Sequence, residues 1–196
     1  IMDFPILSSL ILLPTVGALF IILSRSNKST NFRSSKYVAL FASFANFFIS
    51  IYLWYIFDPS ITEFQFVENR LWLRGFINYK VGIDGISILF IILSTLIASL
   101  CIVSVNSTVN IKLKEFLVAI LLMESLMIGV FCSLDLVIFY LFFEGGLIPM
   151  FLIIGIWGGP RRVYSAFKFF LFTLLGSVLM LVAIISIYWM HDTTDI

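Results

Sequence analysis

Glu144 is the residue in this sequence best placed to do chemistry, because it is ionisable and lies inside an apolar run from Phe116 to Trp157. A carboxylate in hydrocarbon is costly, and such residues mark ion pathways and proton relays. Gly145 and Gly146 lower helix propensity, and Pro149 cannot donate to the carbonyl of Gly145. We therefore expect Glu144 to lie beside a weakened part of its helix, and this combination is typical of an ion pathway.

Glu124 and Lys168 are the other two candidates. A turn near Ser133 and Asp135 divides the apolar run, and the helical rise then places Glu124 and Glu144 at the same depth, about 15 Å from one surface. Two carboxyls at one depth on adjacent helices can share a water file and pass on a proton. Glu124 has the simpler alternative of a protonated group that hydrogen-bonds to a neighbouring helix, and Lys168 that of an interfacial snorkelling lysine.

Composition sets the class of protein that carries these residues. Hydrophobic residues make up 61% of the chain, the mean hydropathy is +1.13, and the apolar residues form runs of a length that spans a bilayer. A chain of 196 residues cannot hide several such runs in one soluble core. The net charge of +1 gives no basic patch for nucleic acid. Cys101 and Cys132 have no pair spacing and are expected to be free.

The fold class we predict is an all-α, polytopic membrane helix bundle with six transmembrane helices. A first unit, residues 1–114, holds the three leading helices and an outer-side loop at 58–82. A second unit, residues 115–196, holds the fourth to sixth helices. The chain begins at Ile1 and stops within a polar stretch at Ile196, so we expect a fragment. The expected spans are Pro5–Leu23, Tyr37–Phe57, Gly82–Ser104, Glu115–Leu134, Asp135–Trp157 and Tyr164–Met190.

The loop between the second and third spans is the longest polar segment. Phe64 and Phe66 alternate with Gln65 and Val67, which favours a short hairpin over the membrane face. Asp84 stands at the start of the third span, where an acidic residue caps the first turn. We prefer this capping role to ion binding.

Basic residues predict the orientation, because Lys and Arg are enriched in inner loops. The loops after the first, third and fifth spans are basic, whereas Arg70, Arg74 and Lys80 on the other side lie among acidic residues. Both ends of the chain are therefore expected on the outer side. The basic residues on the inner side are Arg25, Lys28, Arg33, Lys36, Lys112, Lys114, Arg161 and Arg162.

Four stretches carry a resemblance to a known family: VGIDGISILF from Val81, LLMESLMIGVF from Leu121, DLVIFYLFFEGGLIPMFLIIGIWGG from Asp135, and AFKFFLFTLLGSVLML from Ala166. They are similar to the chain 4 family of proton-pumping NADH–ubiquinone oxidoreductase, respiratory complex I, called subunit M in bacteria. The resemblance covers nearly the whole chain and is most specific in the last three spans. It implies an antiporter-like subunit, of which this chain is the N-terminal segment.

The resemblance also assigns roles. The family's fifth-helix glutamate falls on Glu144, its fourth-helix glutamate on Glu124 and its sixth-helix lysine on Lys168. A family member has fourteen helices in two inverted repeats, and the lysine of its seventh helix has no counterpart here. The resemblance implies a proton pathway in which Glu144 is a switchable carboxylate, Glu124 extends a water-linked route and Lys168 relays charge inward.

The resemblance implies a translocase subunit of the respiratory electron-transport chain without a redox site of its own. We expect no cofactor or metal on this chain: NAD, FMN, iron–sulfur clusters and ubiquinone belong to other subunits. Partners would be other membrane-arm subunits and the lipid bilayer, with no nucleic acid or soluble substrate. The location would be the mitochondrial inner membrane or, alternatively, a bacterial inner membrane. A multi-subunit sodium–proton antiporter and an inert membrane scaffold remain open, although a scaffold needs no buried charge.

Overall fold

Six long apolar helices make up most of the structure, as the run lengths predict. The computed structural model describes residues 5–24, 31–73, 77–108, 112–191 and 193–194. In this part of the chain, six helices are long and apolar enough to cross a membrane. The helices are α1 (Ile6–Leu23), α2 (Asn31–Ile56), α3 (Gly85–Thr108), α4 (Leu113–Cys132), α5 (Leu136–Trp157) and α6 (Arg162–His191), and the strands are β1 (Gln65–Leu73) and β2 (Ile77–Ile83).

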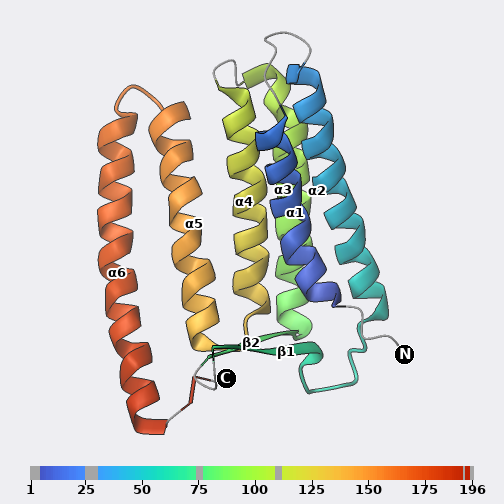
Figure 1. The fold of residues 1–196 in the computed structure, drawn as a ribbon, viewed down its shortest axis with the longest axis vertical. Helices are drawn as coiled ribbons and strands as arrows, with labels where there is room; N and C mark the ends of the chain where they lie inside the picture. The colour runs from blue at the N-terminus through green and yellow to red at the C-terminus, as the bar shows by residue number, and fades with distance from the viewer. Residues whose placement is uncertain (1–4, 25–30, 74–76, 109–111, 192, 195–196) are drawn as a thin grey trace.

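The helices form a four-helix group with a two-helix extension. Helices α1 to α4 stand together, and α5 and α6 lie on one side of them, next to α4 (Figure 1). Helix α4 packs against α1, α2, α3 and α5, whereas α6 packs against α5. Burial follows the number of neighbours: 44% of the apolar span of α4 is buried, but only 11% of that of α6. The division of the chain at residue 114 stays a prediction.

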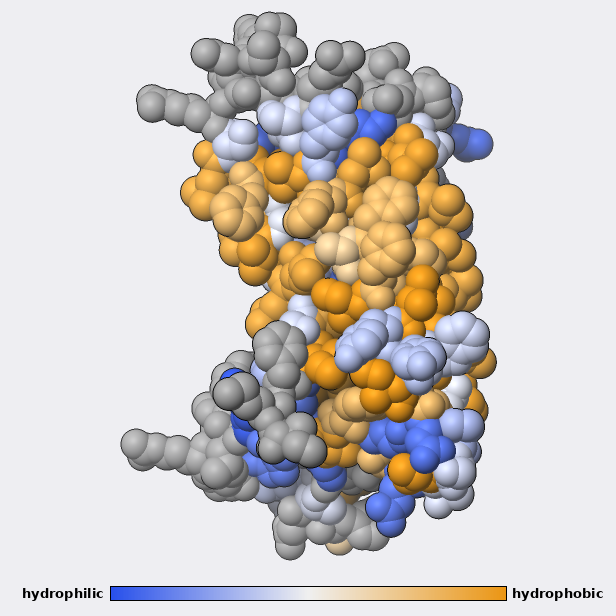
Figure 2. Space-filling model, turned by 90° about the vertical axis from the view of Figure 1, so that its right-hand side faces the viewer, coloured by the Kyte–Doolittle hydropathy of each residue, from blue (hydrophilic) through white to orange (hydrophobic). Residues whose placement is uncertain are grey.

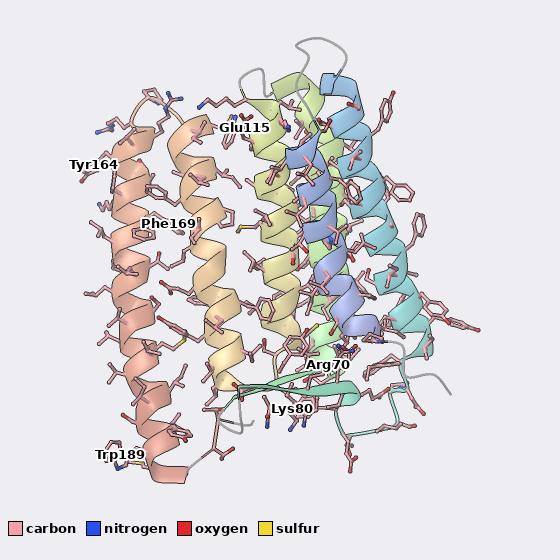
Figure 3. All side chains as sticks on the ribbon, viewed as in Figure 1. Arg70, Lys80, Glu115, Tyr164, Phe169 and Trp189 are labelled. Carbon is pink, nitrogen blue, oxygen red and sulfur yellow. The ribbon has the colours of Figure 1, made fainter. Side chains whose placement is uncertain are left out.

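On the face shown in Figure 2, apolar residues cover the middle of the molecule, and more hydrophilic residues gather at both ends. Glu115 and Tyr164 lie at one end, and Arg70, Lys80 and Trp189 at the other (Figure 3). Such a band is what a bilayer requires of a helix bundle, because lipid-facing side chains must be apolar. Trp189 is 86% exposed at its end of the band, as expected of an interfacial aromatic residue.

The predicted hairpin is confirmed, and it lies across one end of the bundle (Figure 1). Strands β1 and β2 pair antiparallel, with Glu68 opposite Val81. The second strand also contacts the turn between α4 and α5, where the Leu134 N–H donates to the Lys80 carbonyl at 3.0 Å. We call this end the hairpin end. The beginnings of α1, α3 and α5 all lie there.

Carboxylates cap three of the helix starts at the hairpin end. Glu68 of β1 accepts a hydrogen bond of 2.9 Å from the Leu7 N–H in the first turn of α1. Asp84 accepts one of 2.7 Å from the Ser87 N–H, which confirms its predicted capping role. Asp135 accepts from the Val137 N–H at 2.8 Å. Each carboxylate satisfies a donor that has no partner within its helix and opposes the positive end of the helix dipole.

Helix α5 is continuous from Leu136 to Trp157, with Pro149 inside it. The expected weakening beside Glu144 therefore produces no break in the helix. In hydrocarbon, a backbone group without an internal partner is so costly that Gly and Pro are accommodated within a helix. Helix α1 likewise runs through Pro14 without interruption.

Candidate functional site

Glu124 is almost completely buried in the middle of α4, with 3% of its surface exposed. One carboxyl oxygen, Oε1, accepts a hydrogen bond of 2.8 Å from Nδ2 of Asn46 on α2. The other oxygen, Oε2, is buried and has no hydrogen-bond partner among the described residues. Glu124 therefore points toward the leading helices and accepts a hydrogen bond from one of them.

Hydroxyl groups flank the Asn46–Glu124 pair between α2 and α3. The Ser43 and Ser99 hydroxyls lie 2.8 Å apart, and those of Ser50 and Thr95 lie 3.0 Å apart. All four residues are at most 2% exposed. We call these residues, together with Asn46 and Glu124, the polar layer. It occupies a level of the bundle where polar side chains are otherwise costly.

A crevice touches Glu124 from the side of the bundle that faces α5. Its volume is about 260 Å³, and it lies between α3, α4 and α5. Besides Glu124, it is lined by Ser94, Ile97, Ala98, Cys101, Ile120, Met123, Met127 and Ile153. Cys101 is exposed and Cys132 is buried, and both are free, as predicted. Glu124 thus stands between the polar layer on one side and an accessible crevice on the other.

Glu144 lies on α5 at the same height as Glu124. Each is eight positions from the hairpin end of its helix, since 132 − 124 and 144 − 136 both equal 8. At the helical rise this is about 12 Å. The side chain of Glu144 is half-buried, and its Oε2 is buried without a hydrogen-bond partner among the described residues. The predicted common depth is therefore present, but no hydrogen bond joins the two carboxyls in the described part of the chain.

Small residues bring α4 and α5 close together around these glutamates. A Cβ added at Gly129 of α4 would lie 2.5 Å from Cδ1 of Phe142 on α5. A Cβ at Gly145 would lie 3.1 Å from Cδ2 of Leu126 on α4. Glycine permits such close backbone approach in membrane helices. The glycine beside Glu144 therefore serves helix packing.

Lys168 is exposed on α6, six positions after the first residue, Arg162. It makes no hydrogen bond or ion pair with Glu124 or Glu144 within the residues that the structure describes. The three predicted site residues are thus brought to three neighbouring helices, with Glu124 inside the bundle, Glu144 half-buried and Lys168 on the outer surface of α6.

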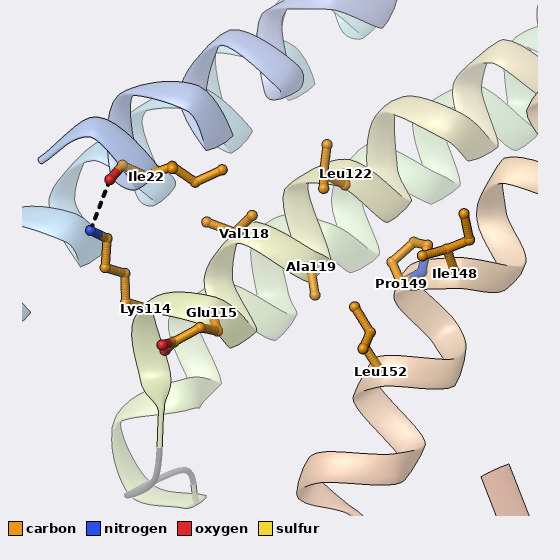
Figure 4. Close-up of a pocket in the computed structure, with 9 residues that line it drawn as sticks. All are labelled: Ile22, Lys114, Glu115, Val118, Ala119, Leu122, Ile148, Pro149 and Leu152. Atoms are coloured by element: carbon orange, nitrogen blue, oxygen red, sulfur yellow. Dashed lines mark hydrogen bonds between the residues drawn. The ribbon is translucent and has the colours of Figure 1, made fainter.

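A second pocket, of about 400 Å³, lies near the opposite end of α4 (Figure 4). Apolar side chains of α4 and α5, including Leu122, Ile148 and Pro149, line most of it. Lys114 at its edge donates to the carbonyls of Ile22 at 3.1 Å and Ser24 at 2.8 Å, and so caps the end of α1.

Sequence reasoning missed Asn46 and the four hydroxyl residues. Their spacing carried a signal, because Ser43, Asn46 and Ser50 recur at intervals of three and four on α2, as do Thr95 and Ser99 at an interval of four on α3. Residues so spaced share one face of a helix. A polar face within an apolar span predicts a buried partner, which here is Glu124.

Comparison with known proteins places this arrangement in context. Residues 133–196 match the family model described as NADH:quinone oxidoreductase/Mrp antiporter, TM. The chain is 53% identical over 192 residues to NADH-quinone oxidoreductase subunit M of Rhodobacter capsulatus, which covers 97% of this chain and 37% of that protein. The resemblance to the subunit M family is confirmed. NADH-ubiquinone oxidoreductase chain 4 of Marchantia polymorpha is 44% identical, covering 97% of this chain and 38% of that protein.

Solved structures agree with the relationship to subunit M. The chain matches a chain of respiratory complex I from Thermus thermophilus with a TM-score of 0.80 and 27% identity, covering 96% of this chain and 38% of that one. A chain of the Mrp complex from Dietzia has the same fold, with a TM-score of 0.78 at 16% identity. The chain spans well under half the length of the subunit M relatives. The apolar helices and the bacterial and mitochondrial relatives indicate an inner-membrane protein.

Proposed function

We propose that this chain is part of a proton-translocating subunit in the membrane arm of NADH:quinone oxidoreductase. The observation that carries the proposal is the similarity to subunit M over 97% of the chain, together with a buried Glu124 and a half-buried Glu144 at one height of adjacent apolar helices. Intramembrane carboxyls of this kind handle protons, because a proton neutralises the charge that hydrocarbon disfavours.

In this proposal Glu144 is the carboxyl that changes protonation during turnover. It is half-buried, so its proton can exchange with a partner outside the six helices while one oxygen faces the interior. Glu124 extends the route into the bundle. Lys168 is exposed on α6, where it can meet a group from elsewhere in the assembly and relay charge toward the inner side. A cation that approaches a carboxylate favours its ionised form, which gives the switch its physical basis.

The energy source in this proposal lies in other subunits. NAD, FMN, iron–sulfur clusters and ubiquinone would be bound there, and the present chain would contribute the membrane passage. Its partners are the other membrane-arm subunits and the bilayer. The basic end of the bundle, where Lys112, Arg161 and Arg162 lie, would face the matrix or cytoplasm. The hairpin end would face the intermembrane space or periplasm.

A sodium–proton antiporter subunit is the second candidate, and the shared fold with the Mrp complex is the observation that favours it. The two functions differ in what drives proton movement. The test uses the full-length protein in its purified complex, reconstituted into liposomes. NADH and a quinone should acidify one compartment in the absence of sodium. Proton movement that requires an imposed sodium gradient and ignores NADH would favour the antiporter.

A further inference from the structure

The polar layer is enclosed on both sides by apolar residues. Toward the hairpin end, a buried cluster that includes Leu53, Ile88 and Ile91 covers it. Toward the opposite end, a second cluster that includes Ile102, Leu117 and Leu121 does so. The layer is therefore closed toward both ends of the bundle and is reached from the side through the crevice at Glu124.

The two hydroxyl pairs of the polar layer are explained by helix packing. Ser43 with Ser99 and Ser50 with Thr95 join α2 to α3, and such interhelical bonds stabilise membrane bundles. This role does not require a carboxyl group. A glutamine at position 124 would give the same helix contact with no ionisable group, so Glu124 calls for a separate explanation.

Two atoms left over in the layer point to that explanation. Among the residues that the structure describes, Asn46 Oδ1 and Glu124 Oε2 are both buried without a hydrogen-bond partner, although Asn46 Nδ2 donates to Glu124 Oε1 at 2.8 Å. Both are acceptors when the carboxyl is ionised. When Oε2 carries a proton, its O–H becomes a donor and Asn46 Oδ1 can accept from it, so that the amide and the carboxylic acid each donate one hydrogen bond to the other. A buried polar group without a partner is costly, which favours this completion.

We propose that Asn46 is the positioning residue for proton binding at Glu124, and that α2 thereby forms one wall of the proton-handling site. Protonation of Oε2 gives a paired amide and acid. Release of the proton through the crevice leaves a single bond from Nδ2 to the carboxylate. This inference rests on the proposed function, because it concerns the route that Glu124 extends. It adds a leading helix to that route.

The test uses infrared difference spectroscopy on the intact complex that contains the full-length protein. The carboxylic acid band of Glu124 is identified as the one that Glu124→Gln removes. Asn46→Leu has a similar volume but no amide, so the band should move to higher frequency as the acid loses its partner. Asn46→Gln, which restores an amide, should return it toward the original position.

Proton pumping provides the second measurement. Asn46→Leu should lower the NADH-driven pumping rate by about tenfold, a factor typical of the loss of one hydrogen bond to a charged group. Asn46→Gln should recover part of it. Ser186→Ala is the matched control, because it removes an exposed hydroxyl on α6 outside the polar layer. It should change neither the band nor the rate.

The outcomes separate this inference from the proposed function. A Glu124 band that is unchanged in Asn46→Leu overturns the role of Asn46, whatever the pumping rate. Normal pumping by Glu124→Gln overturns the place of Glu124 in the proton route, and the band shift still decides whether Asn46 is its partner. If Asn46→Leu does not assemble, Asn46→Ala provides the same loss of the amide with a smaller side chain.

Discussion

Gly129 of α4 and Phe142 of α5 meet so closely that a single added carbon at Gly129 would lie 2.5 Å from the Phe142 ring. This contact sets the spacing of the two helices that carry Glu124 and Glu144. Both glutamates lie within five residues of it along their helices, since 129 − 124 is 5 and 144 − 142 is 2. The glycine is therefore a packing requirement of the candidate site.

Gly129→Ala should destabilise the full-length protein. Alanine gains about 1 kcal/mol of helix propensity over glycine, but overpacking costs about 1–3 kcal/mol. The midpoint of thermal unfolding in detergent measures the net loss. Phe142→Leu in the same chain should restore stability by making room. Gly176→Ala on α6, where no atom lies within 4 Å of the added carbon, is the control and should not lower the midpoint.

The Glu68 cap of α1 should also contribute measurable stability. Its carboxylate accepts from the backbone N–H groups of Leu7 and Ser8 and from the Ser8 hydroxyl. Glu68→Ala removes these bonds and should lower the free energy of unfolding by about 1 kcal/mol. Glu63→Ala, which removes an exposed glutamate in the loop before β1, is the matched control. Equal effects of the two substitutions would contradict the capping role.

Asp84 gives an acid-dependent contribution to stability. Hydrogen bonds from the side chain and the backbone N–H of Ser87 lower the pKa of Asp84 below its usual value of 3.8. A group with a lowered folded pKa stabilises the fold above its unfolded pKa, and this stabilisation is lost as the pH falls through the folded value. Unfolding midpoints recorded from neutral pH to below about pH 4 should therefore fall more in the parent than in Asp84→Asn. Parallel curves would contradict this assignment.

Orientation can be tested with single cysteines on a background without Cys101 and Cys132. Ser60→Cys lies between α2 and β1, at the hairpin end. Glu115→Cys lies at the opposite end (Figure 3), and both parent residues are exposed. A membrane-impermeant thiol reagent should label position 60 from the intermembrane space or periplasm. It should label position 115 from the matrix or cytoplasm. The reverse pattern would overturn the orientation and leave the fold unchanged.

Much of this fold could be predicted because a lipid bilayer allows few backbone structures. A bilayer imposes a span length and forces backbone hydrogen bonds inside each helix, so the six helices follow from apolar runs. The hairpin was visible in the alternation around Phe64. The direction in which Glu124 points could not be predicted, because depth along a helix does not fix which neighbour a side chain meets. That choice depends on how α4 is inserted among α1, α2 and α3, which only the packing determines.

The single fifth span predicted at Asp135–Trp157 is confirmed, and the weakening residues within it do not interrupt α5. Helix propensities measured in water penalise Gly145, Gly146 and Pro149, but hydrocarbon penalises a broken helix more. Asn46 lies within an apolar run, and its role is visible only together with the polar residues on the same face of α2. Asn46 and Glu124 are 78 positions apart in the sequence, so no local pattern predicts that they pair.

The central claim is that Glu144 carries protons, and the most direct measurement is NADH-driven proton pumping by the full-length Glu144→Gln protein in its complex, reconstituted into liposomes. Glutamine keeps the shape of the side chain and removes its titration. Glu144→Gln should abolish or severely reduce pumping and coupled turnover, Glu124→Gln should have a smaller effect, and Glu63→Gln on the exposed loop should have none. Pumping by Glu144→Gln at the parent rate, with assembly of the complex intact, would contradict the account.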